Sequence, residues 1–387
     1  MPASPRTARA INDRLALRFL QEEGPLTAGQ LKERTGLSRP TVADLVERLT
    51  ASGLVAVVGE AGAQRRGPNA KLYGIVADRA HLAALDVRTE GVRLVVADLL
   101  GTVLAEASAP VAPGEETGAA VERAVALLEH TAKEVGAGPL HTVGVGAPGL
   151  IDPATGELRD SSGLPEWHRR LIAALQERLP ARVLVENETN LAALAEQRDG
   201  ATRDRDTFVL LWLGLGIGAA VVLDGRLRRG ASGGTGEVGF LPVPGTGGVP
   251  SAVNCDGGFH SLAGSAAILE LAVEHGLVGP GEPVVRAAEV VRAAVASGAD
   301  RFLDVLADRV VLGAAAVVAV LDPGCVVLAG EVGRAGGDVL AERVASRLAS
   351  MSPLATEVRA GELGGGAVLR GALLMAREAA QEVVFAP

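Results

Sequence analysis

Cysteine, aromatic residues and long apolar runs are scarce in this chain of 387 residues. Two cysteines, Cys255 and Cys325, cannot build a disulfide framework, so we expect a protein of the reducing cytoplasm. Aromatics make up 2% of the chain, so the cores must be built from Val, Leu, Ala and Ile. We expect no secretory leader, because Arg14 and Arg18 interrupt the first apolar run. We also expect no membrane span, which needs about 18–20 apolar residues.

Charge is distributed unevenly along the sequence. Residues 1–75 contain 11 Lys and Arg against 7 Asp and Glu, a net charge of +4, whereas the whole chain carries −9. The remaining residues therefore carry −13. A modestly basic head on an acidic body favours a polyanionic partner for the head alone, although an asymmetry of this size also arises by chance.

The head has the residue pattern of a helix-turn-helix. Thr27 and Gln30 form a capping-box sequence at the start of a second helix. Gly36 suits a left-handed helix end, while Ser38 followed by Pro40 is typical of the start of a third helix. The buried face of that helix is predicted from apolar residues at helical spacing, namely Val42, Leu45, Val46 and Leu49. Two helices joined by a short glycine-containing turn predict the motif.

A two-stranded wing is predicted after the third helix. Residues 53–58 and 71–73 have the composition of paired strands, and the loop between them carries Arg65 and Arg66. We therefore expect a winged helix-turn-helix over residues 1–77 that binds a double-stranded DNA operator, with the wing arginines beside phosphates or in a minor groove.

The predicted recognition helix exposes several polar side chains. Arg39 is the candidate for a guanine contact, and Ser38 and Thr41 are candidates for phosphate contacts. Asp44 lies on the same face and completes the set of candidate DNA-contacting residues on this helix. The alternative is that all four are ordinary solvated residues of an interaction module.

The body repeats one pattern of three short strands. The pattern occurs first at residues 82–87, 92–98 and 103–105, and again at residues 208–213, 219–224 and 226–229. Helical segments alternate with further strands after the first set. This organisation predicts an α/β fold with two similar lobes that face a cleft.

Short motifs follow one another along the body. They are Gly144-Val-Gly-Ala-Pro-Gly149, Val185-Glu-Asn-Glu-Thr-Asn190, Gly214-Leu-Gly-Ile-Gly218, Gly236-Glu-Val-Gly239 and Val327-Leu-Ala-Gly330. Their order and spacing resemble the ROK family (repressors, open reading frames and kinases) over nearly the whole chain. The resemblance implies a winged helix-turn-helix followed, over residues 82–387, by a two-lobed actin-like ATPase domain of the sugar-kinase type. The expected lobes cover about residues 82–190 and 191–387.

The resemblance also implies that the catalytic set of the family's kinases is degenerate here. Glu188 stands at the position of the general base, where an Asp is usual, and its extra methylene displaces the carboxylate. Asp86-Val-Arg-Thr-Glu90 replaces a glycine-rich first phosphate loop, so we expect impaired ATP binding. The second loop retains its glycines as a phosphate-loop remnant, namely Gly214, Gly216 and Gly218.

The sugar-binding positions implied by the resemblance are only partly kept. Phe240 stands where a His binds both sugar and zinc, Gly163 where an Asn is common, and Ser261 roughly where a second Glu is expected. Cys255 alone remains of the zinc-binding cysteines, so we expect no metal site and no cofactor. The candidate ligand-binding residues are Asn187, Glu188, Glu237 and His260.

Three functions follow as hypotheses. An intact head together with an eroded catalytic set favours a transcriptional regulator, and specifically a repressor. Its body would form a homodimer or homotetramer and sense a carbohydrate-like effector. The alternative is an ATP-dependent sugar kinase with an accessory DNA-binding head, based on the second glycine loop and on Asn187, Glu188 and Glu237. A repressor that senses no ligand is the third, since the retained motifs can serve the fold alone.

Overall fold

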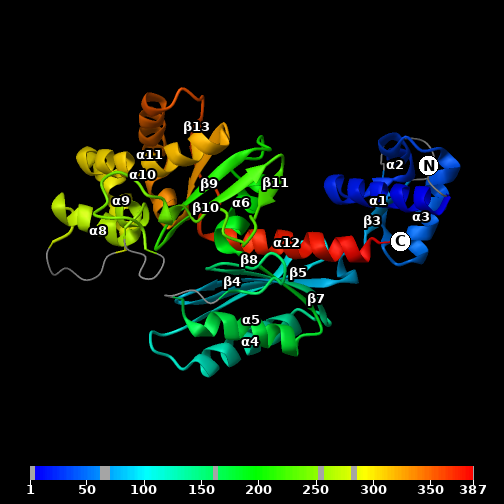
Figure 1. The fold of residues 1–387 in the computed structure, drawn as a ribbon. Coiled ribbons are helices and arrows are strands. Elements are labelled where there is room, and N and C mark those ends of the chain that lie inside the picture. Colours follow the sequence, from blue (N-terminus) through cyan, green and yellow to red (C-terminus); the bar gives the residue numbers. More distant parts are fainter. Residues whose placement is uncertain (1–4, 62–69, 160–163, 252–256, 280–285, 387) are drawn as a thin grey trace.

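The computed structural model of the chain describes residues 5–61, 70–159, 164–251, 257–279 and 286–386. A small helical head precedes two lobes, each built on a five-stranded sheet (Figure 1). Among the described helices, none combines the length and apolar character that crossing a bilayer requires.

The head is a three-helix unit with a wing. Its elements are α1 (Pro5–Glu23), β1 (Leu26–Thr27), α2 (Ala28–Thr35), α3 (Arg39–Ala51), β2 (Val55–Ala61) and β3 (Ala70–Ile75). Both halves of the predicted capping box form at Thr27 and Gln30, and Gly36 ends α2 with a left-handed φ of 68°. Strands β2 and β3 pair antiparallel, and β1 pairs with β3. The predicted winged helix-turn-helix is confirmed, while Arg65 and Arg66 lie outside the described residues.

The first lobe is a five-stranded sheet with two of its helices on one face. A short 3₁₀ turn, η1 (Ala77–Arg79), leads into β4 (His81–Arg88), β5 (Gly91–Asp98), β6 (Val103–Pro110), α4 (Thr117–Glu134), β7 (Leu140–Ala147), α5 (Glu166–Arg178) and β8 (Arg182–Asn187). The strand order is β6-β5-β4-β7-β8, with the first three antiparallel and the last two parallel. Alternate residues of β4 face opposite sides: Ala83 and Leu85 join the core under α4 and α5, whereas Leu82 and Ala84 join the core on the other face.

The second lobe repeats this topology. Its elements are β9 (Phe208–Leu213), β10 (Ile217–Leu223), β11 (Arg226–Arg228), η2 (Val238–Phe240), α7 (His260–Ala263), α8 (Ser265–Glu274), α9 (Ala287–Ser297), α10 (Asp300–Leu321), β12 (Cys325–Ala329), α11 (Gly330–Met351) and β13 (Glu357–Ala360). The strand order β11-β10-β9-β12-β13 matches that of the first lobe strand for strand. The sheet order thus confirms the internal repeat predicted from the sequence.

Two helices lie between the sheets and exchange lobes. Helix α6 (Glu188–Asp199) follows the first sheet but packs on β9 and β10 of the second sheet, as well as on the neighbouring helix α12 (Ala367–Val384). Helix α12 follows the second sheet, after η3 (Gly364–Gly366), and packs on β4 and β7 of the first. The expected division at residue 190 places α12 in the second lobe, whereas α12 packs on the sheet of the first lobe. The exchange requires glycine, because a Cβ on Gly371 would lie 2.1 Å from the carbonyl oxygen of Leu191.

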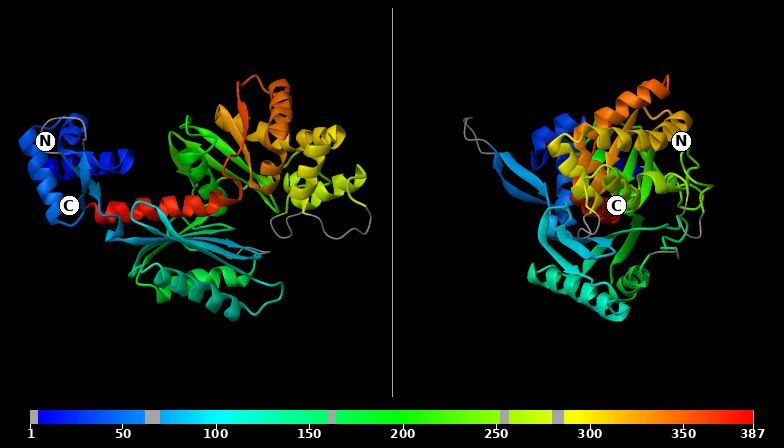
Figure 2. Two further views of the ribbon diagram at one scale, coloured as in Figure 1. Left: turned by 180° about the vertical axis from the view of Figure 1, so that it is seen from behind. Right: turned by 90° about the vertical axis from the view of Figure 1, so that its left-hand side faces the viewer.

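Head and body share one hydrophobic core. Leu17, Leu20 and Ile75 of the head belong to the same cluster as Leu99 and Leu373 of the body. Helix α12 runs from between the lobes to the head, and its C-terminal end lies beside the head (Figure 2). The head is therefore docked on the body through α12 and the first sheet.

Candidate nucleic-acid interface and interlobe site

Helix α3 presents one buried and one exposed face. Val42, Leu45, Val46 and Leu49 are buried as predicted. Arg39 is exposed at the first turn and makes no hydrogen bond or ion pair with any described residue. Ser38 caps the helix: its Oγ accepts from the Thr41 backbone N–H at 3.3 Å and lies 2.8 Å from Thr41 Oγ1. Arg39 is thus the candidate whose charge is fully available to a polyanion.

Asp44 is the candidate with an intramolecular partner. Its carboxylate pairs with Arg48 one turn later, and Arg48 Nη2 also lies 2.6 Å from Asp13 Oδ1 on α1. Arg48 thereby fixes α3 on the first helix. The sequence reasoning missed Arg48, although the i, i+4 spacing of Asp44 and Arg48 is a readable signal.

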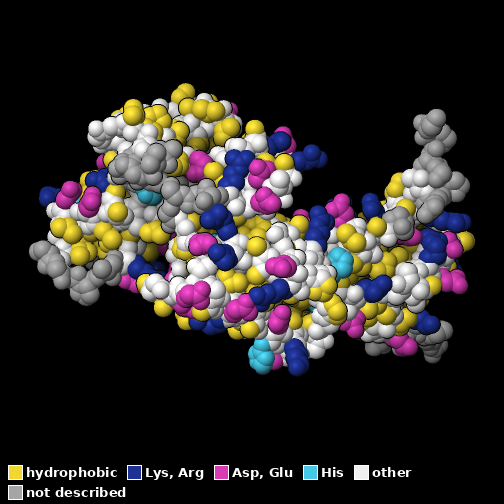
Figure 3. Space-filling view, turned by 60° about the horizontal axis from the view of Figure 1, so that its bottom comes forward, with side chains coloured by type: hydrophobic (Ala, Val, Ile, Leu, Met, Phe, Trp, Pro, Cys, Tyr) yellow, Lys and Arg dark blue, Asp and Glu magenta, His cyan; other side chains and the backbone are white. Residues whose placement is uncertain are grey.

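Basic and acidic side chains alternate on the body. On the face shown in Figure 3, Lys and Arg side chains are interspersed with Asp and Glu side chains over the described part of the lobes. Mixed charge of this kind gives no continuous positive track for a phosphate backbone on that face. The distribution agrees with the net negative charge of the body and leaves the head as the candidate nucleic-acid interface.

Carboxylates from both lobes converge between the sheets. This interlobe carboxylate cluster consists of Asp86 at the end of β4, Glu188 at the start of α6, Glu237 before η2 and Glu331 at the start of α11. Burial and the negative charges of Asp86, Glu331 and Glu237 raise the pKa of Glu188 to about 8. The positive charge of Arg88 acts in the opposite direction and lowers it. Burial also raises the pKa of Asp86 and that of Glu237. At pH 7 Glu188 is therefore mostly a neutral acid, whose hydroxyl is available as a hydrogen-bond donor.

Arg88 lies within the first-loop region and is held there by three contacts. Its Nη2 lies 2.7 Å from Oδ2 of buried Asp86 and 3.0 Å from the carbonyl oxygen of Gly365. Its own carbonyl oxygen is 3.2 Å from Nε2 of His168, a fully buried residue of α5. Arg93 Nη1 donates to the same Gly365 carbonyl at 3.2 Å. The guanidinium thus neutralises Asp86 and ties β4 to the η3 turn.

A carboxylate lies against the second glycine loop. Gly214 N–H donates to the Gly216 carbonyl at 3.1 Å, and a Cβ on Gly214 would lie 2.5 Å from Glu331 Oε2. Gly218 lies against Thr189, whose Oγ1 would be 3.2 Å from such a Cβ. Glu331 was missed in the sequence, although it directly follows the Val327–Gly330 stretch. Its negative charge disfavours a phosphate group at this loop.

Asn187 has a structural role at the start of α6. Its Oδ1 accepts from the Thr189 backbone N–H at 2.8 Å, and its Nδ2 donates to the Gly149 carbonyl at 2.9 Å. The neighbouring Glu186, also missed, is buried between Asn190 Nδ2 at 2.9 Å and Arg229 Nε at 2.5 Å. These bonds join the Gly144–Gly149 stretch, α6 and the segment after β11.

The other predicted positions are spread around this region. Phe240 is 38% exposed at the end of η2, and Ser261 Oγ donates to the Gly258 carbonyl at 2.8 Å. His260 is half-buried, burial lowers its pKa, and its ring approaches Gly216 of the glycine loop. Cys325 is buried in β12, as a strand residue would be. Two further positions lie outside the described residues, Gly163 and Cys255.

Comparison with known families decides the relationship. A model of the ROK family matches residues 82–379, which is most of the chain. The chain belongs to the ROK family. A model of the MarR family matches residues 11–67, the helix-turn-helix of the head. The resemblance drawn from the motifs is thereby confirmed, as is the fold class.

Both repressors and an enzyme are found among the similar proteins. The chain is 25% identical to the xylose repressor of Caldicellulosiruptor bescii over 237 residues, 61% of this chain and 59% of that protein. It is 38% identical to the bifunctional enzyme NanE/NanK of Brucella suis over 205 residues, 52% of this chain and 35% of that protein. The match thus spans about three fifths or less of either relative.

A solved structure shares the whole architecture. The crystal structure of a ROK family transcriptional regulator, a homologue of the Escherichia coli MLC protein, superposes with a TM-score of 0.76 at 19% identity and covers 98% of both chains. At this identity the likeness concerns the fold. It includes the head as well as the two lobes, because the coverage is nearly complete.

Proposed function

We propose that the protein is a DNA-binding transcriptional regulator, a repressor, that acts in the cytoplasm. Its ROK body forms a homodimer or homotetramer and senses a carbohydrate-related small molecule, and it does not act as a kinase. The observation that carries the proposal is Arg39, exposed on a capped recognition helix and without a hydrogen-bond or ion-pair partner among the described residues. The named xylose repressor among the relatives supports the same class.

In this proposal the head contacts operator DNA through α3 and the wing. Arg39 enters the major groove, since a bidentate arginine–guanine contact is the commonest specific one. Phosphates are contacted by the start of this helix, at Ser38 and Thr41, and by the wing residues Arg65 and Arg66. Asp44 helps to orient the helix through its ion pair with Arg48. A symmetric dimer then binds inverted half-sites.

The interlobe site supports sensing over phosphoryl transfer. An ATP phosphate needs backbone N–H groups and cations, whereas Arg88 is already paired with Asp86 and Glu331 lies against Gly214. These residues do not fit a nucleotide. Asn187, Glu188, Glu237 and His260 instead form a polar surface between the lobes, in which neutral Glu188 donates to a hydroxyl group of the effector.

The test is a gel-shift titration with DNA from upstream of the protein's own gene. We expect salt-sensitive binding, and we expect Arg39→Ala to weaken it by about 10–100-fold, as the loss of a bidentate base contact predicts. Arg301→Ala, an exposed arginine of α10, is the matched control and leaves binding unchanged. Binding that is insensitive to both salt and Arg39 would refute the proposal.

A sugar kinase with an accessory head is the second candidate. It is favoured by the NanE/NanK relative and by Glu188 and Glu237 at carboxylate positions between the lobes. A coupled assay of ADP release across common hexoses and amino sugars tests it. Turnover that disappears in Glu188→Gln would establish this candidate, and absence of turnover together with absence of an ATP-induced thermal shift would exclude it.

A further inference from the structure

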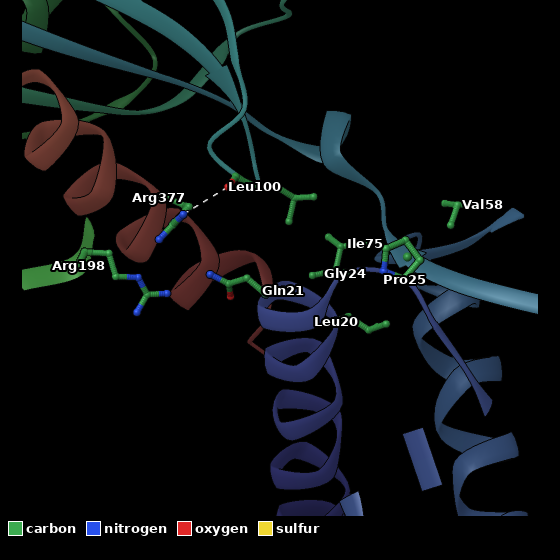
Figure 4. A pocket seen from close by; sticks show the side chains of 10 residues that line it. Leu20, Gln21, Gly24, Pro25, Val58, Ile75, Leu100, Arg198 and Arg377 are labelled. Carbon is green, nitrogen blue, oxygen red and sulfur yellow. Dashed lines mark hydrogen bonds between the residues drawn. The ribbon is translucent and has the colours of Figure 1, made fainter. Parts of the chain in front are cut away.

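A cavity lies where the head meets the body, away from the interlobe site. It has a volume of about 220 Å³ and is lined by residues of α1, the turn after α1, β2, β3, the turn between β5 and β6, α6 and α12. Figure 4 shows the head contributing Leu20, Pro25 and Ile75 on one side. Arg377 of α12 and Arg198 of α6 line the other side.

The two arginines give this cavity an unbalanced positive charge. Nη1 of Arg377 donates to the Leu100 carbonyl over a long 3.4 Å, and its buried Nε has no hydrogen-bond partner among the residues that the structure describes. Arg198 makes no hydrogen bond or ion pair with any described residue. Asp199, next to Arg198, is bound to Arg370 at 2.7 Å, and Glu378, next to Arg377, is exposed to solvent. Burial lowers the pKa of Arg377, and the positive charge of Arg198 lowers it further.

An unsatisfied buried donor beside a second cation is costly unless an anion supplies the missing acceptor. Guanidinium groups bind carboxylate and phosphate oxygens through paired N–H donors. Gln21 also lines the cavity, and the rest of the wall is largely apolar, from Leu20, Pro25, Val58 and Ile75. A ligand that satisfies both sides carries an oxyanion at one end and a small apolar group at the other.

We propose that this junction cavity binds a small organic oxyanion, held by Arg377 and Arg198, and that its occupancy sets the position of the head on the body. On the head side, Leu20 and Ile75 of the cavity wall belong to the hydrophobic core of the helix-turn-helix, whereas Arg377 belongs to α12, which continues to the η3 turn between the lobes. A bound oxyanion therefore adds a contact between the two parts. The binding step stands on its own, while its effect on DNA rests on the proposed function.

The binding test uses isothermal titration of the full chain in the absence of DNA. The probes are phenyl phosphate, inorganic phosphate, benzoate and the uncharged benzyl alcohol. We expect phenyl phosphate or benzoate to bind at least tenfold more tightly than benzyl alcohol, and the comparison of those two anions decides between a phosphate and a carboxylate ligand. Inorganic phosphate, which lacks the apolar part, binds more weakly than phenyl phosphate.

Variants locate the site. Arg377→Gln and Arg198→Gln each weaken binding of the anionic probe at least tenfold, and the exposed Arg301→Gln on α10 leaves it unchanged. Arg198 is itself exposed, so its substitution tests the site even where Arg377→Gln fails to fold. Absence of binding to the wild-type chain, or binding unaffected by both substitutions, would overturn the proposal.

The coupling to the head is measured separately by the dissociation constant for DNA with and without the saturating probe. We expect at least a threefold change in the wild-type chain and none in Arg198→Gln. An unchanged dissociation constant with intact probe binding would overturn the coupling. Loss of all DNA binding with intact probe binding would instead refute the proposed function and leave the anion site standing.

Discussion

Substitution of Glu188 by Gln is expected to change how stability depends on pH. The pKa of Glu188 rises from 4.5 to about 8 in the folded chain because the side chain is buried and faces Asp86 and Glu331. A carboxyl group whose folded pKa is raised favours the native state fully below pH 4.5 and loses that contribution as pH rises through 8. Since Gln does not titrate, the variant lacks this loss.

The size of the effect follows from the shift. Each unit of pKa corresponds to about 1.4 kcal/mol, so a shift from 4.5 to about 8 converts to at most about 5 kcal/mol. Glu188 keeps part of its surface in contact with solvent, and screening reduces the difference to about 2 kcal/mol. The free energy of unfolding of the wild type should therefore fall by about 2 kcal/mol more than that of Glu188→Gln between pH 5 and pH 8.5.

Urea unfolding, followed by circular dichroism at several pH values, measures this difference. Glu270→Gln, an exposed glutamate of α8, is the control and should follow the wild type. Asp86 and Glu237 titrate in the same direction, so only the difference between the variants reports on Glu188. Parallel pH profiles of the wild type and Glu188→Gln would refute the burial of this carboxyl group.

Three further substitutions test contacts that hold the fold, each measured by urea unfolding. Arg88→Ala removes the partner of buried Asp86 and should cost about 2 kcal/mol at neutral pH, and less as the pH falls and Asp86, whose pKa burial raises, takes up a proton; a loss that does not change with pH would argue against the pair. Thr27→Ala removes the helix cap and should cost about 1 kcal/mol, and an unchanged midpoint would show that the capping box is not formed. Arg229→Ala leaves Glu186 with its remaining donors and should cost about 1–2 kcal/mol, whereas a neutral effect would place Glu186 in contact with water.

Sequence reasoning worked best where the signal is local. The caps at Thr27 and Ser38 and the left-handed Gly36 involve residues four or fewer positions apart, so the local sequence contains both partners of each bond. The alternation of buried residues along β4 is similarly readable, because one strand carries both faces. The repeated three-strand pattern, read as two lobes, has its counterpart in the identical order of the two sheets.

The candidate site was predicted less completely. Asn187, Glu188 and Glu237 were identified from the family motifs, but the helix-capping bonds of Asn187 were left as one alternative among two. Glu331 and Glu186 were missed, because their importance comes from what lies opposite them and not from a motif. Arg88 was considered only as part of the Asp86–Glu90 stretch that replaces the first glycine loop, and its bond to Gly365 joins residues 277 positions apart.

The sequence by itself determined the winged helix-turn-helix, the α/β class and the family, because capping, periodicity and motif order are properties of neighbouring residues. Only the tertiary structure decided that α6 and α12 exchange lobes, that three carboxylates surround Glu188, and that Arg198 and Arg377 meet at the head. These features depend on contacts between segments far apart in the chain. Packing brings such segments together at positions that no local pattern specifies, and the charges they carry acquire their pKa values and their partners only there.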